Sequence, residues 1–440
     1  MAKEEIFFLA CLRLFLKGEA VSADEIRNEI QICLEEGMDW HLILSWSHWH
    51  GVTPLIYHIL KKTDWAGIPE EITEILERRF RVNMARNLFL SAEIDRVFEA
   101  LGKRGIMSIP IKGIFLSEEV YPDISFRMIT DIDLLIRRED LMSAEESLVE
   151  LGYCRDYPLR EEFFPENCYT LHMEKGEKNG QKICVELHWG LANRRDYSLP
   201  LDNWWKKISS MVADKSAGNR SMIGNGPTIN NGSMVVDRSM VADRRNVQNG
   251  YSKSGTRRLR MGPEITLIYL TINAHMSHYL FLKQLVDIAQ VIKFYEQDMD
   301  WKNVTCIARE LGLLDNLIFA LGLVQKMFDV TIAESPTHQS TPWKQRLLQS
   351  LFTEERLIRG KIGQDMRQFL LLLLLHEKVV FHSIRKVLFS SQEAVAYRYS
   401  LAPQSCRTYL YLFLNPFFSL YRLLRGSVVD CWAGKGIGKG

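Results

Sequence analysis

Two aspartates lie two residues apart in a strand-like run of the sequence, ITDIDLLI. Alternate side chains of a strand point to opposite faces, so Asp131 and Asp133 should project together while Ile132 and Leu134 face the other way. Paired carboxylates repel each other unless a cation lies between them, and their hard oxygen atoms suit Mg²⁺ or Mn²⁺ bridging to phosphates. The pair predicts a divalent metal site, with a solvated strand face as the plainer alternative.

A third carboxylate follows in the alternating run ICVELHW. Glu186 and His188 should share one face of this strand. In two-metal phosphoryl transfer, a further acid beside the shared pair helps to bind the ion that activates the attacking hydroxyl. Glu186 is therefore the predicted third metal ligand, and a solvated strand face is again the alternative.

The segment before these acids, MSIPIKGIF, indicates a strand, then Lys112 and Gly113, then a helix that runs through Glu119. A glycine lets the backbone approach a ligand closely, and a helix N-terminus presents amide donors to phosphate. This order of elements favours an anion-binding role for the turn and supports the metal interpretation of the aspartates.

The elements that must position these residues indicate an α+β protein, with a small mixed sheet flanked by helical regions. Helical spacing fills residues 1–100, and short strand-like runs alternate with helices over 101–208. Residues 209–260 are rich in Ser, Asn, Gly and Arg and repeat a short phrase, which predicts a low-complexity insertion. A helical lobe over 261–335 and a helical region with a tail over 336–440 complete the predicted domains.

Composition bears on nucleic-acid binding, on the redox state of the cysteines and on membrane insertion. The 55 basic and 54 acidic side chains leave a net charge of +1, which supplies no bulk attraction for nucleic acid. The eight cysteines form no CxxC pair and are interpreted as reduced thiols of a cytoplasmic protein. The strongest apolar run, Phe369 to Leu375, is far shorter than the roughly 20 residues that cross a bilayer, so we expect no membrane span.

Histidines gather near the N-terminus among several tryptophans. They lie in helix-like sequence without metal-ligand spacing, so packing or capping is the favoured role. The histidines in question are His41, His48, His50 and His58.

A family resemblance rests on IKGIFLSEEVYPDISFRMITDIDLLI, on ELGY at 150–153 and on VELHW at 185–189. These runs resemble the uncharacterised nucleotidyltransferase family of the polymerase-β-like superfamily, and flanking helical segments extend the similarity over about residues 35 to 330. The resemblance implies that Lys112, Gly113 and Arg127 contact a triphosphate. Arg127 precedes the paired aspartates, where an arginine pairs bidentately with phosphate oxygens; a surface ion pair is its alternative role.

The resemblance also implies an enzyme that moves a nucleoside monophosphate from an NTP to an acceptor and releases pyrophosphate. The sequence does not identify the acceptor, which we expect to be a small molecule, a peptide or RNA. Asp131, Asp133 and Glu186 would bind Mg²⁺ or Mn²⁺. The family has Lys-Gly where better-known relatives in the superfamily have Gly-Ser, and the missing serine hydroxyl leaves two further hypotheses. One is a nucleotide-binding regulatory or scaffold protein without turnover, and the other is a toxin-like transferase.

Overall fold

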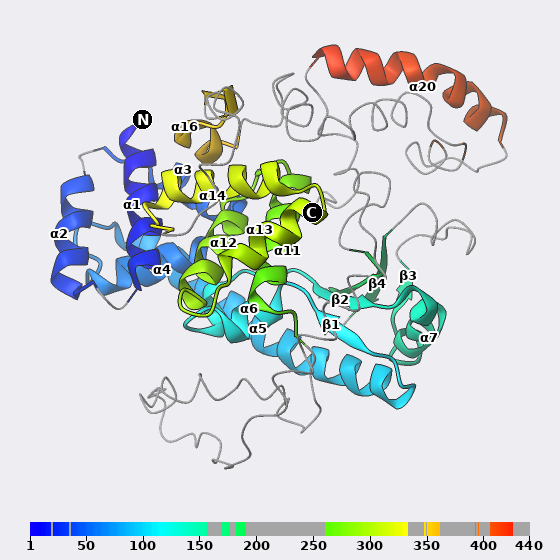
Figure 1. Cartoon of the computed structure of the whole chain (residues 1–440). Helices are drawn as coiled ribbons and strands as arrows, with labels where there is room; N and C mark the ends of the chain where they lie inside the picture. Colours follow the sequence, from blue (N-terminus) through cyan, green and yellow to red (C-terminus); the bar gives the residue numbers. More distant parts are fainter. Residues whose placement is uncertain are drawn as a thin grey trace. The chain divides into compact units, whose positions relative to one another are not determined.

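The computed structural model describes residues 1–18, 21–34, 37–155, 169–176, 182–190, 260–332, 347–348, 350–360, 392, 395 and 405–425 (Figure 1). The predicted insertion at 209–260 lies outside the described residues except for Arg260, and so does the apolar run at 369–375. Among the helices of the described residues, none combines the length and apolar character needed to cross a membrane.

The described residues form two compact units. One comprises residues of 1–80 and those from 267 onward; the other comprises residues 81–190 and 260–266. The division falls within helix α5 (Glu70–Lys103) and within helix α11 (Pro263–Met276). The predicted domain bounds stay predictions.

The first unit is helical wherever it is described. At some of its helices the N-cap side chain accepts a hydrogen bond from a backbone amide of the first turn, as Ser22 does from Glu25 and Asp300 does from Asn303. Besides the shares of α5 and α11, its helices are α1 (Lys3–Lys17), α2 (Ala23–Cys33), α3 (Trp40–Trp49), α4 (Thr53–Lys62), α12 (Leu282–Phe294), α13 (Trp301–Glu310), α14 (Leu314–Phe328), α16 (Glu354–Ile358) and α20 (Cys406–Arg425).

His50 has a packing and capping role in this unit, as the sequence predicts. It is the C-cap residue of α3 and is fully buried. Its Nε2–H donates to the carbonyl of Ile358 at 2.6 Å, and its Nδ1 accepts from the amide of Leu282 at 3.3 Å. Both ring nitrogens are therefore committed in the neutral imidazole.

The second unit contains a five-stranded mixed sheet in the order β1-β2-β5-β4-β3. The β2–β5 pair is parallel, and the other neighbouring strands are antiparallel. The strands are β1 (Ser108–Pro110), β2 (Ile132–Ile136), β3 (Cys154–Arg155), β4 (Thr170–Gly176) and β5 (Lys182–His188); the helices are α6 (Ile114–Glu119) and α7 (Leu141–Glu150), with 3₁₀ turns η2 (Ile124–Phe126) and η3 (Arg138–Asp140). The predicted α+β class with a small mixed sheet is confirmed.

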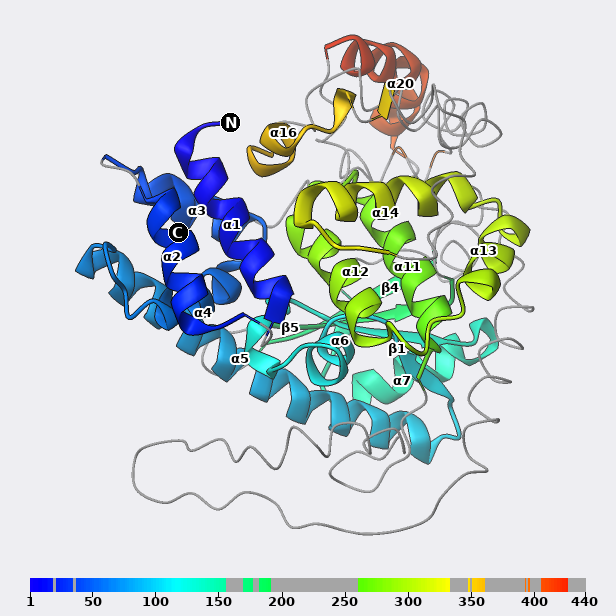
Figure 2. The same cartoon turned by 60° about the vertical axis from the view of Figure 1, so that its left-hand side comes forward.

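One face of this sheet is apolar and covered by helices. Ile132, Leu134, Val185 and Leu187 belong to a single buried cluster with apolar side chains of α5 and α7. Figures 1 and 2 show these two helices on the same side of the sheet. Because strand side chains alternate, the residues between these apolar positions are placed on the opposite face.

Candidate metal and nucleotide site

Strand register places the predicted acids side by side. Asp133 of β2 lies opposite Glu186 of β5, and Leu135 lies opposite His188. Both polar residues of β5 therefore share a face with Asp133. The alternation expected from the sequence thus places Asp133, Glu186 and His188 together, although Asp133 and Glu186 are 53 residues apart along the chain.

Asp131 lies just before β2 rather than within it, because the strand begins at Ile132. The carbonyls of Ile129 and Thr130 accept hydrogen bonds from the Arg86 side chain of α5, at 3.1 and 2.8 Å. The backbone just before Asp131 therefore bonds to a side chain, and hydrogen bonding between strands begins only at Ile132. The interpretation of both aspartates as strand residues was wrong for Asp131.

Lys112 offsets part of the negative charge of the aspartate pair. The amide of Ile111 donates to the carbonyl of Asp133, which places Lys112 directly after the last hydrogen bond between the two segments. Its Nζ lies 2.9 Å from Asp133 Oδ1 and 3.9 Å from Asp131 Oδ2. The cation that two neighbouring carboxylates require is supplied here by the lysine that the sequence assigns to phosphate.

Two histidines hold Glu186 from opposite sides. Nδ1–H of His172, on β4, donates to Glu186 Oε1 at 3.1 Å. Nε2–H of His188 is shared between Asp133 Oδ1 at 3.1 Å and Glu186 Oε2 at 3.3 Å. A continuous chain of contacts therefore runs from Lys112 through the acids to His172.

Burial, followed by the charge of Asp131, raises the pKa of Asp133 above its ordinary value, and Lys112 and His188 oppose this rise. The Asp133 side chain is fully buried, and its Oδ2 has no hydrogen-bond partner. A buried carboxylate oxygen without a donor is costly, and a cation is the ligand that best satisfies it.

Burial also acts to raise the pKa of Glu186, but the hydrogen bonds from His172 and His188 outweigh it, and the pKa is lowered far below its usual range. The same contacts raise the pKa of both histidines: for His172 the bond to Glu186 dominates, and for His188 the bonds to Asp133 and Glu186 overcome burial. Glu186 is therefore ionised and poorly suited to act as a proton acceptor.

Gly113 has a conformation that favours glycine, with φ of 62° and ψ of −117°. A Cβ atom at this position would lie 3.2 Å from the carbonyl oxygen of Asp131 and 3.7 Å from Asp133 Oδ2. The glycine thus leaves open the space beside the unpartnered carboxylate oxygen. The helix that follows, α6, has only six residues.

The sequence model of the family described as "Uncharacterised nucleotidyltransferase" matches residues 36–219 and 238–329, which is more than half of the chain. The chain belongs to this family. No curated protein and no solved structure matches it. The matched residues agree with the resemblance noted over residues 35 to 330, and the gap between the two matched segments lies within the predicted insertion.

In this family member, Arg127 is positioned through its backbone. Its carbonyl accepts from Asn87 Nδ2 at 2.7 Å and from Asn83 Nδ2 at 3.4 Å, and Asn87 also donates to the carbonyl of Ile124 at 2.6 Å. The Arg127 residue is buried. Its role in binding phosphate remains a prediction.

Sequence reasoning missed the residues that support the site from α5 and β4. Asn83 and Asn87 lie one helical turn apart on a helix that otherwise shows an apolar stripe, which is a readable signal for a polar contact. His172 lies between Leu171 and Met173 in an alternating run, so its place on the polar face of the sheet was also readable. Neither signal indicates which segment the side chain meets.

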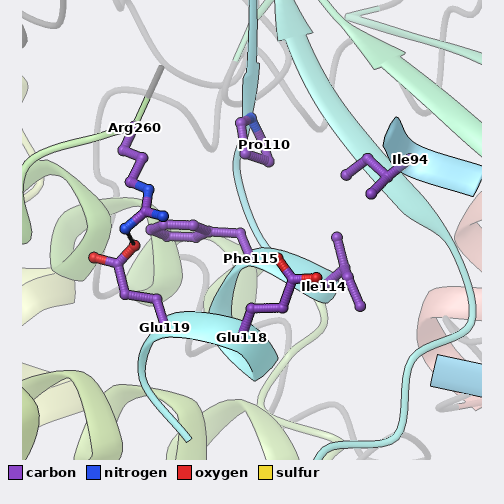
Figure 3. Close-up of a pocket in the computed structure, with 7 residues that line it drawn as sticks. All are labelled: Ile94, Pro110, Ile114, Phe115, Glu118, Glu119 and Arg260. Atoms are coloured by element: carbon purple, nitrogen blue, oxygen red, sulfur yellow. Dashed lines mark hydrogen bonds and ion pairs between the residues drawn. The ribbon is translucent and has the colours of Figure 1, made fainter. Parts of the chain in front are cut away.

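A separate small cavity lies beside α6 (Figure 3), with an empty volume of about 280 Å³ that includes space open to solvent. Its two glutamates already have partners, because Glu119 pairs with Arg260 and Glu118 accepts from Ser91 at 2.5 Å. The lining residues are Ile94, Pro110, Ile114, Phe115, Glu118, Glu119 and Arg260. The acidic cluster therefore lies outside the lining of this cavity.

Proposed function

We propose that this family member is a metal-dependent enzyme that transfers a nucleoside monophosphate from an NTP to an acceptor and releases pyrophosphate. The observation that carries the proposal is the buried, unpartnered Oδ2 of Asp133, beside Gly113 and in a cluster with Asp131 and Glu186. Family membership supports nucleotidyl transfer in general. The metal, the triphosphate and the acceptor belong to the proposal.

The donor set fits a divalent ion. Asp131, Asp133 and Glu186 would hold Mg²⁺ or Mn²⁺, since carboxylate oxygens are the preferred ligands of both ions. A bound ion would neutralise charge on the phosphates and lower the pKa of an attacking hydroxyl. The unpartnered oxygen and the raised pKa of Asp133 both indicate that the site lacks positive charge even with Lys112 in place.

The residues of the chain have separate tasks. The Lys112 ammonium contacts the carboxylates of both aspartates. We propose that a bound metal ion would replace it there and that the ammonium would then contact the triphosphate. Gly113 keeps the approach to Asp133 open, and Arg127 is proposed to pair with phosphate oxygens. His188 and His172 orient Glu186.

The proposed transfer forms one bond and breaks one. An oxygen of the acceptor attacks the α-phosphorus, the bond from this phosphorus to the bridging oxygen of the β-phosphate breaks, and pyrophosphate leaves with that oxygen. The proton of the acceptor hydroxyl passes to solvent. Positioning of the triphosphate and stabilisation of its charge supply the catalysis, as in other phosphoryl transfers.

The test combines binding with turnover. The full-length protein is titrated with each NTP in the presence of Mg²⁺ or Mn²⁺, and pyrophosphate release is followed with pooled small-molecule, peptide and RNA acceptors. We expect binding and metal-dependent release, both lost in Asp133→Asn. Tight binding without release from any pool would instead favour a regulatory or scaffold protein, and absence of NTP binding would reject both functions.

A further inference from the structure

A second group of metal-binding side chains lies on the polar face of the sheet. His172 of β4 lies opposite Glu186 of β5, and Cys184 precedes Glu186 by two residues, so all three project from the same face. One ligand atom from each residue lies within 4.8 Å of the other two. The group shares only Glu186 with the three predicted acids.

The spacing within this group suits a coordination shell. His172 Nδ1 and Glu186 Oε1 are 3.1 Å apart. Ligand atoms bound to one ion at about 2.1 Å lie roughly 3.0 Å apart in octahedral geometry and roughly 3.4 Å apart in tetrahedral geometry. The separation between His172 and Glu186 thus matches one edge of a metal polyhedron, in which an ion would take the place of the Nδ1 proton and that proton would pass to solvent. The Cys184 sulfur lies within 4.8 Å of a ligand atom of each of these residues.

Glu186 directs its two oxygens to different neighbours. Oε1 meets His172, while Oε2 meets His188, which in turn contacts Asp133. The His172 side chain is about half exposed, at 49%, so an ion can reach it from solvent. Cys184 is half-buried and has no disulfide partner. The carboxylate can therefore bridge an oxygen-rich site and a softer site.

We propose that His172, Cys184 and Glu186 form a binding site for a borderline-soft divalent transition metal, best suited to Zn²⁺. Thiolate and imidazole ligands select zinc over magnesium, which prefers oxygen ligands. Three protein ligands leave a fourth tetrahedral position for water. The site shares Glu186 with the proposed catalytic site, but its other two donors are an imidazole and a thiolate, and it selects a different ion.

Zinc at this site inhibits nucleotidyl transfer, a consequence that rests on the proposed function. An ion bound to Oε1 draws Glu186 toward β4 and withdraws electron density from the carboxylate. The catalytic ion then loses its third ligand or holds it weakly. Zinc inhibition should therefore depend on His172, which orients Glu186 in the proposed transferase, and on Cys184, which has no role in the proposed transfer.

Metal binding can be measured without nucleotide. The reduced full-length protein is titrated with Cd²⁺, whose thiolate complexes give an ultraviolet charge-transfer band, and Zn²⁺ is added to displace it. We expect the band in the wild-type protein and in Cys154→Ser, a control thiol on β3, which pairs with β4 and not with the strand of Cys184. Cys184→Ser should lose it. An unchanged band in Cys184→Ser would overturn the proposed site.

A second variant tests the site independently if Cys184→Ser does not fold. His172→Gln changes a half-exposed side chain, and we expect it to weaken Zn²⁺ binding by at least about tenfold, as the loss of a coordinating or supporting group does. Equal Zn²⁺ affinity in His172→Gln and wild type would also overturn the site. Because neither titration contains an NTP, a negative result here is distinct from failure of the transferase proposal.

The inhibitory role has its own measurement. Pyrophosphate release is followed at fixed Mg²⁺ while Zn²⁺ is increased, in wild type, Cys154→Ser and His172→Gln. The activity of each protein is expressed relative to its own activity without Zn²⁺. We expect wild type and Cys154→Ser to be inhibited at the same Zn²⁺ concentration and His172→Gln to need at least about ten times more, matching its loss of affinity. Equal inhibition of all three proteins would contradict the coupling through Glu186.

Discussion

Removing the ammonium of Lys112 should destabilise the protein and increase the thermal stabilisation that a divalent metal ion provides. At 2.9 Å from Asp133 Oδ1, the charge pair is worth about 6 kcal/mol at an effective dielectric constant of about 20. Breaking a buried pair typically costs about 3–5 kcal/mol. His188 still donates to Asp133 in Lys112→Met, so we expect the lower end, about 3 kcal/mol, or a fall in Tm of roughly 10 °C.

The matched control is Lys175→Met. Lys175 Nζ lies 3.0 Å from Glu93, whose side chain is 2% exposed, and its own side chain is about as buried as that of Lys112. Thermal unfolding of both variants is measured with and without Mn²⁺, in the absence of nucleotide. We expect both to lose stability and only Lys112→Met to regain it with Mn²⁺. Equal rescue of the two variants, or none of either, would refute the idea that lysine occupies the place of an ion.

Three further predictions concern stability. In Gly113→Ala, the alanine must adopt a positive φ, and its Cβ lies close to the carbonyl oxygen of Asp131. The free energy of unfolding in urea should therefore fall by about 1–3 kcal/mol, and an unchanged midpoint would contradict this. Asn87→Ala removes the hydrogen bonds that this side chain donates to the carbonyls of Ile124 and Arg127, so the same assay should show a loss of about 2 kcal/mol. Equal stability of the variant and the wild type would count against a stabilising role for these two bonds. Burial lowers the pKa of His50 from 6.5 to about 4, so the native state binds fewer protons than the unfolded chain and stability falls as pH drops from about 6.5 toward 4. Between pH 7 and pH 5 the loss is about 2 kcal/mol, and His50→Gln should flatten this dependence; an equal pH dependence in the variant would refute it.

The sequence predicted the polar face of the sheet well, because strand alternation is a local property. Glu186 and His188 could be assigned to one face from ICVELHW alone, and the apolar side chains of β5 belong to the buried cluster with α5 and α7. The parallel pairing of β2 with β5 is not local. It sets Asp133 opposite Glu186. From the sequence, only the chemistry of two-metal phosphoryl transfer and the family resemblance gave a reason to join them.

The electrostatic balance of the site could not be read from the sequence. A Lys-Gly pair indicates an anion-binding turn, and in the structure the Lys112 ammonium contacts the carboxylates of the two aspartates. This contact depends on the turn at Gly113 and on the hydrogen bond between Ile111 and Asp133, which are tertiary features. The same holds for His172, whose contact with Glu186 follows from the register between β4 and β5.

The central claim is that Glu186 completes a carboxylate site for a metal-bound NTP. Calorimetric titration of Mg²⁺-NTP into wild type, Glu186→Gln and Glu174→Gln tests it most directly, since Glu174 is a paired carboxylate on the adjacent strand. We predict that Glu186→Gln weakens binding by at least about tenfold, or about 1.4 kcal/mol, while Glu174→Gln binds as the wild type does. Equal affinities in all three proteins would contradict the claim.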